Sequence, residues 1–326
     1  MDVTHIPELA VKSAYPVMMA RHAAVPGVRD QIADIRFIEP GTMYGDKGTT
    51  IIGGSRLIER EDGAGFAQDR MEKGWTWQIK VRNYGKELPL DNRLIEASSS
   101  TEIGNIIAEW AASVAQNSAY QKEQFVADLL QKGTLTAGDS IFDGSFPGND
   151  DPNPLFIYDG LPLFDTAHTI KVGSGTYANH VASSALTSAN LTSAKVLMQQ
   201  TSAVDDRGER IMNMAQSIIV PPSMEATARV LLNSQQLPGS PNNDVNIHQG
   251  TLGLIVNPFL SDTASASAWW LKMSEPGIRF YEQRGGPAVR VYQKEETNQT
   301  IVQLNDYWGG GATNWRGLGA FNKAAS

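Results

Sequence analysis

The feature that most constrains the fold of this chain is one long stretch of helical periodicity, residues 99–132. Apolar side chains recur there near helical spacing, at Ile103, Ile106, Ile107, Trp110, Val114, Phe125 and Leu129. Ser99 and Glu102 have the spacing of an N-terminal capping box, and Lys132-Gly133 is typical of a helix end. The pattern predicts a helix of about 30 residues, on the order of 45 Å long, which can serve as a spine for other elements.

A two-stranded extension is predicted before this helix. Residues 75–82 alternate apolar and polar side chains, which is typical of a half-buried strand, and residues 51–58 offer a partner strand. The segment between them mixes acidic and basic residues with glycines, which indicates a flexible tip. Because an isolated ribbon is marginally stable in water, we expect it to lie on another surface.

The remaining segments predict an arm, a loop and an α/β lobe. Prolines at positions 7, 16, 26 and 40 indicate that residues 1–47 form an irregular arm with at most short helices. Residues 138–160, rich in Asp, Gly, Pro and Asn, form a loop and a boundary. The lobe and the tail after it contain predicted helices at 192–201 and 223–232, and predicted strands at 217–221, 253–257, 268–273, 288–293 and 300–304. A turn, EETN, separates the last two strands, and a glycine-rich stretch, 306–319, follows them.

Composition excludes several classes of protein. The chain has 326 residues, 41% hydrophobic and 19% charged, as expected for a globular protein with a substantial core. A net charge of −8 argues against tight binding to nucleic acid, because phosphate binding needs clustered Lys and Arg. The absence of Cys excludes disulfides, thiolate nucleophiles and Cys-ligated zinc. No stretch has the pattern of a signal peptide or a membrane span, so a cytoplasmic protein is the default expectation.

One short motif raises the question of catalysis. In LPLFDTAHT, residues 161–169, the spacing of Asp165 and His168 would let a carboxylate orient an imidazole. A hydrolase using this pair would also need a nucleophile, and the GxSxG elbow is absent. Three glycine-flanked serines, in GGS (53–55), DGSFPG (143–148) and GSGT (173–176), are better explained as turns. The hydrolase hypothesis therefore stays a remote alternative.

Metal and phosphate sites have no support in the sequence. The five histidines, His5, His22, His168, His180 and His248, do not form an HExxH pair, and GxxxxGK[ST] is absent. GGG (309–311) lacks the strand and spacing of a dinucleotide site, and NDDPN (149–153) lacks EF-hand spacing. We predict no catalytic, cofactor-binding or metal-binding residues.

Aromatic and charged side chains point to packing and subunit contact. Aromatic residues gather near the C-terminus, at Phe280, Tyr281, Tyr292, Tyr307, Trp308 and Trp315. Few basic residues accompany them, so packing explains them better than base stacking. The charged insert, 56–73, is a solvated face whose mixed signs also suit salt bridges to a neighbouring subunit.

Several sequence motifs, taken together, resemble those of a known family. They are DGLPLFDTAHT (159–169), NLTSAKVLMQQ (190–200), DDRGERIMNMAQSIIVPPSMEATARVLLNS (205–234), NPFLSD (257–262), AWWLKM (268–273) and NWRG (314–317). The chain resembles major capsid proteins of tailed bacteriophages, and most closely the major head subunit of Mu-like phages. In that family the segment with Asp165 and His168 is structural and has no catalytic role.

The resemblance implies an α+β architecture, the tailed-phage major capsid or Johnson fold. The expected layout is an N-terminal arm (1–47), an extended loop (48–90), a peripheral domain with the long spine helix (91–154), an axial domain (155–285), returning peripheral-domain strands (286–313) and a C-terminal segment (314–326). Some relatives form covalent crosslinks, but nothing in the sequence assigns one to the lysines in or beside the loop, such as Lys47, Lys73 and Lys86.

The function implied by the resemblance is self-assembly, not catalysis. Hexamers and pentamers of the chain would form an icosahedral shell, assembled in the host bacterial cytoplasm, that encloses double-stranded DNA in the virion. Expected partners are other copies of the chain, a separate scaffolding protein, a portal and decoration proteins, with no cofactor, no membrane and no sequence-specific DNA contact. The nearest alternative is an encapsulin-like nanocompartment with a protein cargo.

Overall fold

The computed structural model describes residues 6–38, 47–134, 157, 159–236, 244–261 and 265–324, apart from the single positions 53, 55, 64, 67 and 70. The chain forms two compact units. Unit 1 comprises residues 1–45, 80–128 and 279–310, and unit 2 comprises residues 46–79, 129–278 and 311–326. Helix α4 (Ser100–Gln131) and strands β11 (Ile278–Gln283) and β13 (Gln299–Ala312) therefore each contain residues of both units.

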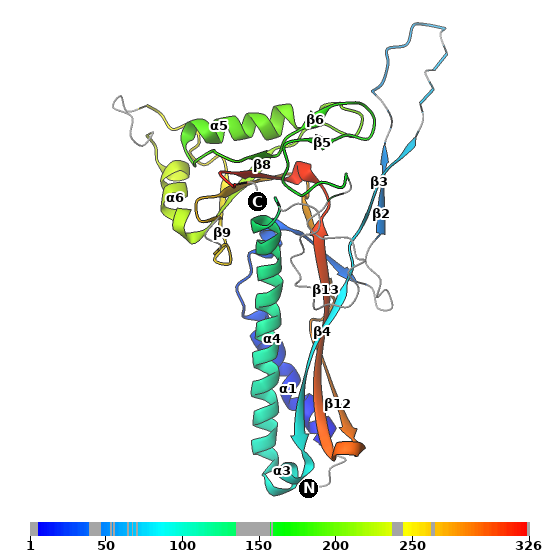
Figure 1. The fold of residues 1–326 in the computed structure, drawn as a ribbon, viewed down its shortest axis with the longest axis vertical. Coiled ribbons are helices and arrows are strands. Elements are labelled where there is room, and N and C mark those ends of the chain that lie inside the picture. The colour runs from blue at the N-terminus through cyan, green and yellow to red at the C-terminus, as the bar shows by residue number, and fades with distance from the viewer. Residues whose placement is uncertain are drawn as a thin grey trace. The chain divides into compact units, whose positions relative to one another are not determined.

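A five-stranded sheet forms the centre of unit 1. Its order is β1 (Asp34–Ile38), β11, β13 and β12 (Ala288–Lys294), and β4 (Arg82–Asp91) also pairs with β13. Both β12 and β4 run antiparallel to β13, whereas β1 runs parallel to β11. The long strand β13 is thus the central strand of this sheet (Figure 1).

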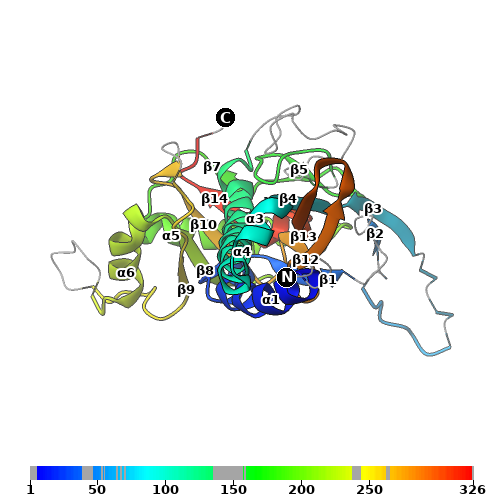
Figure 2. The same ribbon diagram turned by 90° about the horizontal axis from the view of Figure 1, so that it is seen from below.

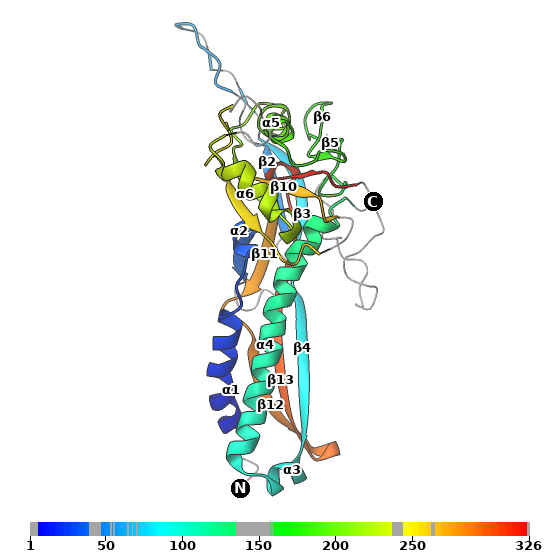
Figure 3. The same ribbon diagram turned by 90° about the vertical axis from the view of Figure 1, so that its left-hand side faces the viewer.

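The predicted spine helix is confirmed at both of its ends. Ser99 Oγ accepts a hydrogen bond from the N–H of Glu102 at 3.3 Å, and α4 ends at Gln131, before Gly133. The helix has 32 residues, hence a length of about 48 Å. Short helix α3 (Asn92–Ala97) leads into it from β4, and α4 then runs beside β4 and β13 (Figure 3).

The apolar face of α4 explains why the helix packs on this sheet. Ile103, Ile107, Ala111 and Ala115 are buried on it at helical spacing. They form a cluster with Leu90, Ile95, Val302 and Leu304, from β4, α3 and β13. Burial of each large aliphatic side chain contributes about 1.5–3 kcal/mol, so the periodicity of α4 fixes which face meets the sheet.

The prediction that residues 1–47 contain at most short helices is wrong for residues 6–23. Residues Ile6–Ala23 form helix α1, with 18 residues and Pro16 in its interior. Pro7 lies in the first turn, where a missing N–H costs little, but Pro16 removes one helical hydrogen bond. Ala14 and Met18 are fully buried in the cluster formed with α4, and this packing offsets the cost of Pro16.

A buried ion pair joins α4 to the sheet of unit 1. The Lys122 side chain is 1% exposed, and its Nζ lies 2.9 Å from Asp306 Oδ2 and 3.6 Å from Glu282 Oε2. Ser118, one turn earlier on α4, donates a further hydrogen bond to Asp306 Oδ2. Because a buried charge is tolerated only with such partners, Lys122 fixes the register between α4, β11 and β13.

A second carboxylate on α4 holds the N-terminal segment. Glu123 Oε2 accepts hydrogen bonds from the backbone N–H groups of Val28 and Arg29, at 2.9 and 3.0 Å. The Arg29 guanidinium lies 2.9 Å from Glu282 Oε2 on β11. The first residue of α2 (Arg29–Ile32) is therefore held by groups from both α4 and the sheet.

The core of unit 2 surrounds another five-stranded sheet. The order is β7 (His180–Val181), β14 (Leu318–Phe321), β10 (Trp269–Met273), β8 (Ala215–Val220) and β9 (Gly253–Val256). Two helical segments contribute to its core: α5 (Ser188–Val196), continued by a π-helical turn, η2 (Leu197–Thr201), and α6 (Glu225–Asn233), preceded by a 3-10 turn, η3 (Pro222–Met224). Figure 2 shows both helices beside these strands.

The sequence patterns of the lobe are confirmed by this core. Leu191, Ala194 and Met198 come from the first helical segment, and Ala228, Leu231 and Leu232 come from α6. They pack against the buried positions Ile218, Val220, Trp269, Leu271, Met273 and Phe321 of the sheet. The predicted helices and strands of residues 192–273 agree with these elements within a few residues.

Strand limits in the two-stranded extension differ from those predicted. The ribbon consists of β2 (Lys47–Ile52) and β3 (Glu72–Gln78), paired antiparallel from Lys47↔Gln78 to Ile52↔Glu72. The predicted strand at 51–58 ends at Ile52, because Leu57 and Ile58, 102% and 72% exposed, have no core to pack on.

The predicted strand at 300–304 extends much farther. β13 continues through the glycine-rich residues to Ala312, because β4 pairs with it as far as Trp308. Gly309 allows a close approach of two backbones, since a Cβ there would lie 2.2 Å from the Lys80 carbonyl oxygen. The predicted turn before β13 is confirmed: a short 3-10 turn, η5 (Glu295–Thr297), is followed by Asn298 in the left-handed region, at φ 51°.

Substitution Lys122→Met should destabilise the protein by about 3–5 kcal/mol, because it leaves Asp306 buried without its cation. Urea unfolding followed by circular dichroism measures the loss. The matched control is the double variant Lys122→Met with Asp306→Leu, which removes both charges and should recover most of the stability. Equal losses in the single and double variants would contradict a paired role for Lys122.

His22 on α1 makes the stability of unit 1 depend on pH. Burial lowers the pKa of His22 below its ordinary value of 6.5, and Lys122 and Arg29 lower it further, against Asp306 and Glu282. Below about pH 6.5 the unfolded chain therefore binds a proton more readily than the folded chain, and folding stability falls as the pH falls. We expect His22→Gln to lose less stability than the native chain between pH 7.5 and 5.5, measured by urea unfolding. Parallel pH profiles of the two proteins would rule out this contribution.

Candidate functional site

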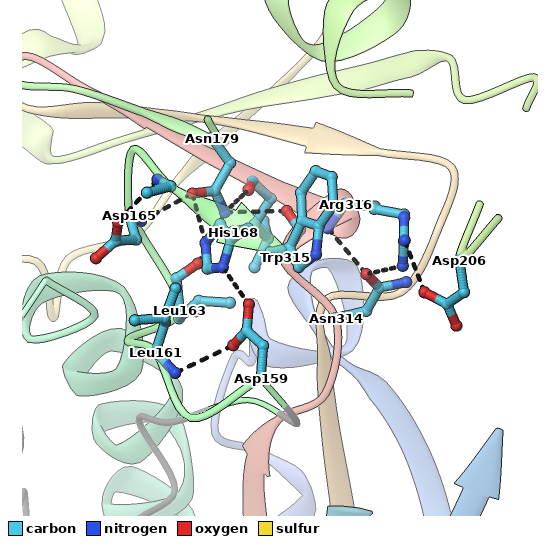
Figure 4. A network of polar contacts seen from close by, with 12 residues as sticks. Asp159, Leu161, Leu163, Asp165, His168, Asn179, Asp206, Asn314, Trp315 and Arg316 are labelled. Carbon is cyan, nitrogen blue, oxygen red and sulfur yellow. Dashed lines mark hydrogen bonds and ion pairs between the residues drawn. The ribbon is translucent and has the colours of Figure 1, made fainter. Parts of the chain in front are cut away.

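The motif with Asp165 and His168 lies in a buried polar network of unit 2, shown in Figure 4. Short strand β5 (His168–Thr169) pairs with β6 (Thr176–Tyr177) and brings His168 into the interior. The His168 side chain is completely buried. Its ring stacks on Trp315, with centroids 5.3 Å apart and planes 3° from parallel.

The carboxylate that contacts His168 is Asp159, and not Asp165, whose spacing from His168 would allow such a contact. Asp159 Oδ2 lies 2.8 Å from His168 Nδ1, and both side chains are fully buried. Asp165 Oδ1 instead accepts the N–H of Ala167, which closes a turn. Asp159 reaches the ring because the chain turns at Gly160, where φ is 78°. The other carboxylate oxygen, Asp159 Oδ1, accepts the N–H of Leu161.

Asn179 is the centre of the network. Its Nδ2 lies 2.8 Å from the carbonyl oxygen of Leu163 and 3.0 Å from those of Trp315 and Leu318. Three carbonyl acceptors identify this atom as the nitrogen, so Oδ1 is the acceptor that faces His168 Nε2 at 3.2 Å. Oδ1 also accepts the N–H of Asp165 at 3.0 Å. One fully buried side chain thus joins two segments, residues 163–168 and 315–318, that are far apart in the sequence.

The NWRG motif supplies the other side of the network. Asn314 Oδ1 caps a 3-10 turn, η6 (Trp315–Gly317), by accepting the N–H of Arg316. The Arg316 guanidinium lies over the Trp315 ring, 4.6 Å from its centroid, and donates to the Val204 carbonyl and to Asp206 Oδ1. Gly317 is needed because a Cβ would lie 2.1 Å from the Gly277 nitrogen. Every residue of the motif has a structural task.

This arrangement can hold the fold together but offers no place for a reaction. Both ring nitrogens of His168 face protein partners, and Trp315 covers one face of the ring. A general base must reach the proton that it abstracts from a substrate, and a fully buried imidazole has no such access. Within the described part of the chain, no group of three or more His, Cys, Asp or Glu side chains is placed to hold a metal ion.

Apart from Trp315, which stacks on His168, the other candidate residues lie elsewhere. GSGT (173–176) forms the turn between β5 and β6, whereas DGSFPG (143–148) and NDDPN (149–153) lie outside the described residues, as do two positions of GGS (53–55). The aromatic residues Phe280, Trp308 and Trp315 are buried, which agrees with packing. Phe280 and Trp308 stack in unit 1, with centroids 5.6 Å apart.

The charged insert makes ion pairs within its own chain. Arg56 Nε lies 2.8 Å from Glu209 Oε2, and Asp69 Oδ1 lies 3.7 Å from Arg207 Nη2. Large apolar side chains on the same segment remain exposed: Leu57, Ile58, Phe66 and Met71, at 102%, 72%, 83% and 74%. An exposed group of this kind is typical of a surface that contacts a partner.

Sequence reasoning missed three members of the network: Asp159, Asn179 and the Arg316–Asp206 pair. The Asp159-Gly160 dipeptide is a turn signal, but nothing in it indicates which side chain the carboxylate reaches. Asn179 has no sequence signature, because its partners are backbone carbonyls. Asp159, Asp206 and Arg316 lie in motifs that carry the family resemblance, DGLPLFDTAHT, the segment 205–234 and NWRG, but the resemblance does not say which side chains meet.

Comparison with protein families identifies the class to which the chain belongs. Residues 76–320 match a family model described as "Phage capsid protein". Since the match covers most of the chain, the chain belongs to this phage capsid family. A comparison with curated proteins finds no match.

A solved structure supports the fold. A chain from a structure of Mycobacterium phage Patience is 12% identical, with 98% of this chain and 88% of that chain covered and a TM-score of 0.54. A chain from "Capsid structure of the Cyanophage P-SCSP1u" is 13% identical, with 92% and 89% covered and a TM-score of 0.48. The α+β tailed-phage capsid fold expected from the sequence is confirmed. No helix in the described ranges has the length and apolar character needed to cross a membrane.

The partner of His168 can be tested with a matched pair of variants. We expect Asp159→Ala to lower the free energy of unfolding by about 2–4 kcal/mol, because it leaves a buried imidazole nitrogen without its acceptor. Asp165→Ala removes one hydrogen bond in a partly exposed turn and should cost about 1 kcal/mol or less. Urea unfolding of both variants at pH 7 measures the difference. A larger loss of stability for Asp165→Ala than for Asp159→Ala would contradict the role of Asp159 as the partner of His168.

Proposed function

We propose that this chain is the major head subunit of a tailed phage or prophage, and that hexamers and pentamers of it form an icosahedral shell around double-stranded DNA. The observation that carries the proposal is the match to the phage capsid family over residues 76–320. The Mu-like subfamily is our narrower proposal, supported by the sequence words from DGLPLFDTAHT to NWRG.

We assign the two units to the parts of such a subunit. Unit 1, with α4 and the sheet around β13, corresponds to the peripheral domain, which in this proposal includes the returning strands after residue 286. Unit 2, with the sheet around β10, corresponds to the axial domain (155–285) and the C-terminal segment (314–326). The ribbon of β2 and β3 corresponds to the extended loop (48–90), and α1 belongs to the N-terminal arm (1–47).

The mechanism of assembly that we propose is the sum of many weak contacts. Exposed apolar side chains between β2 and β3 would lie over a neighbouring subunit and lose their contact with water there. They are Leu57, Ile58, Phe66 and Met71. Each contact is reversible by itself, but a closed shell holds all of them at once. A scaffolding protein, a portal and decoration proteins are the further partners, and the host cytoplasm is the place of assembly.

The acidic character of the chain suits a container for DNA. The net charge is −8, and α4 has only one basic residue, Lys122, which is buried against Asp306. A surface without clustered cations can enclose a polyanion without binding it tightly. No catalytic activity is part of the proposal.

Negative-stain electron microscopy of the expressed protein, alone and with neighbouring phage genes, tests the proposal. We expect closed shells, or rings of five and six subunits. DNA inside the shells would support a phage head, whereas a protein cargo would favour the encapsulin-like alternative. A persistent monomer or dimer under both conditions would contradict self-assembly.

Deletion of residues 59–73 should leave a soluble, folded subunit that forms no shells. The deletion removes two of the exposed apolar residues, Phe66 and Met71, and most of the ribbon tip. The matched control keeps the length of the segment but replaces the same fifteen positions, 59–73, with glycine and serine. We expect this variant to form no shells either, because in this proposal the side chains make the contact. Normal shells from the deletion would show that the ribbon tip is dispensable for assembly.

A further inference from the structure

A second polar cluster of unit 2 lies where α5 meets the residues before β9. Lys195, on α5, places its Nζ 3.0 Å from Thr251 Oγ1 and 3.5 Å from His248 Nδ1. The His248 residue is only 2% exposed, whereas Lys195 is partly exposed. None of these residues belongs to the network around His168.

The hydrogen positions at His248 follow from its neighbours. Nε2 lies 3.0 Å from the Ser188 carbonyl oxygen and 3.3 Å from Thr192 Oγ1, and the Thr192 hydroxyl itself donates to the Ser188 carbonyl. Since a carbonyl oxygen can only accept, Nε2 carries a hydrogen. In the neutral ring, Nδ1 therefore has a lone pair directed toward Lys195.

Burial favours this neutral form of His248. It lowers the pKa of His248, and the nearby charge of Lys195 lowers it further, although the hydrogen bond to Ser188 acts in the opposite direction. Thr251 is fixed in a similar way, because its hydroxyl donates to the His248 carbonyl at 3.0 Å. Its oxygen is then left to accept from Lys195. Both partners of the Lys195 nitrogen are neutral acceptors.

The partners of Lys195 differ in charge from those of the buried Lys122. Lys122 lies beside two carboxylates, whereas no ion pair to Lys195 is found within the described part of the chain. Burial without a compensating anion lowers the pKa of Lys195, because the charged ammonium loses water and gains no counterion. A lowered pKa leaves a larger share of the Lys195 amine unprotonated, and the imidazole lone pair beside it can accept a proton. Nucleophilic lysines usually have both features.

We propose that Lys195 is a site of acylation by activated acyl donors of the acyl phosphate class, with His248 as the proton acceptor. The Nζ lone pair attacks the acyl carbon, a C–N bond forms, and the bond from that carbon to the phosphate oxygen breaks. Inorganic phosphate leaves with the bonding electron pair. The proton lost from nitrogen passes to His248 Nδ1 and from there to water. The product is a neutral amide.

Acylation would change the contact that Lys195 makes. The amide keeps one N–H, so Lys195 could donate to Thr251 or to His248 but not to both. The positive charge next to His248 would also be lost. The modification therefore alters the link between α5 and the residues before β9, which include the exposed side chains of Val245 and Ile247.

The test uses the full chain and acetyl phosphate at pH 7.5, with acetylation at each lysine followed over time by mass spectrometry. Two exposed lysines, Lys86 and Lys294, report the ordinary rate, and Lys272, whose pKa burial also lowers, reports the effect of burial without His248. We expect Lys195 to react about tenfold faster than the exposed lysines, because burial leaves a larger share of its amine unprotonated. A rate at Lys195 no higher than at Lys86 would overturn the proposal.

The variant His248→Gln separates the proton acceptor from the hydrogen-bond geometry. Glutamine can donate to the Ser188 carbonyl and accept from Lys195, but it does not take up a proton at neutral pH. The rate at Lys195 should fall severalfold, with Lys86 unchanged; an unchanged rate at Lys195 would exclude His248 from the reaction.

If the variant does not fold, the pH profile of the native chain decides. The rate at Lys195 should begin to rise at a lower pH than the rate at Lys86, and coincident profiles would overturn the proposal.

Discussion

The side chain of Asn179 is the interaction on which unit 2 depends most. It joins Leu163, Trp315 and Leu318 through their carbonyl oxygens, and it orients His168 through its own oxygen. Leu163 lies far in the sequence from Trp315 and Leu318, so the Asn179 side chain connects two distant segments. Because each carbonyl is buried, loss of the amide would leave several polar groups without partners at once. The Asn179 side chain therefore adds to the strand pairing of β14 with β10 and β7 in holding the C-terminal residues.

Local signals predicted the elements whose stability is local or periodic. The capping contact of Ser99 and the apolar stripe of α4 can be read from the sequence, since both depend on residues three or four positions apart. Helix α1 was missed because Pro16 argues against a helix, and only packing of Met18 against distant residues explains it. The Asp159 contact was missed for the same reason: in sequence Asp165 is nearer to His168, but the turn at Gly160 decides which carboxylate reaches the ring.

The two buried networks solve the same physical problem in different ways. In unit 1 a full charge, Lys122, is compensated by carboxylates from two strands. In unit 2 most of the contacts around Asn179 are neutral, and Arg316 and His168 add charge-assisted contacts at the edges. Apolar packing tolerates small shifts between elements, whereas such polar contacts are lost when the register changes. A subunit that must present the same surfaces in every copy benefits from this kind of register control.

The interleaving of the two units has a consequence for how this protein can change over evolutionary time. The chain alternates between them after residues 45, 79, 128, 278 and 310, and α4, β11 and β13 are shared. Neither unit corresponds to a continuous gene segment, so recombination cannot exchange one of them as a block. Insertions in loops can be tolerated, because they leave the shared elements intact. Variation among relatives should therefore accumulate as substitutions and loop extensions, with the alternating order of segments kept.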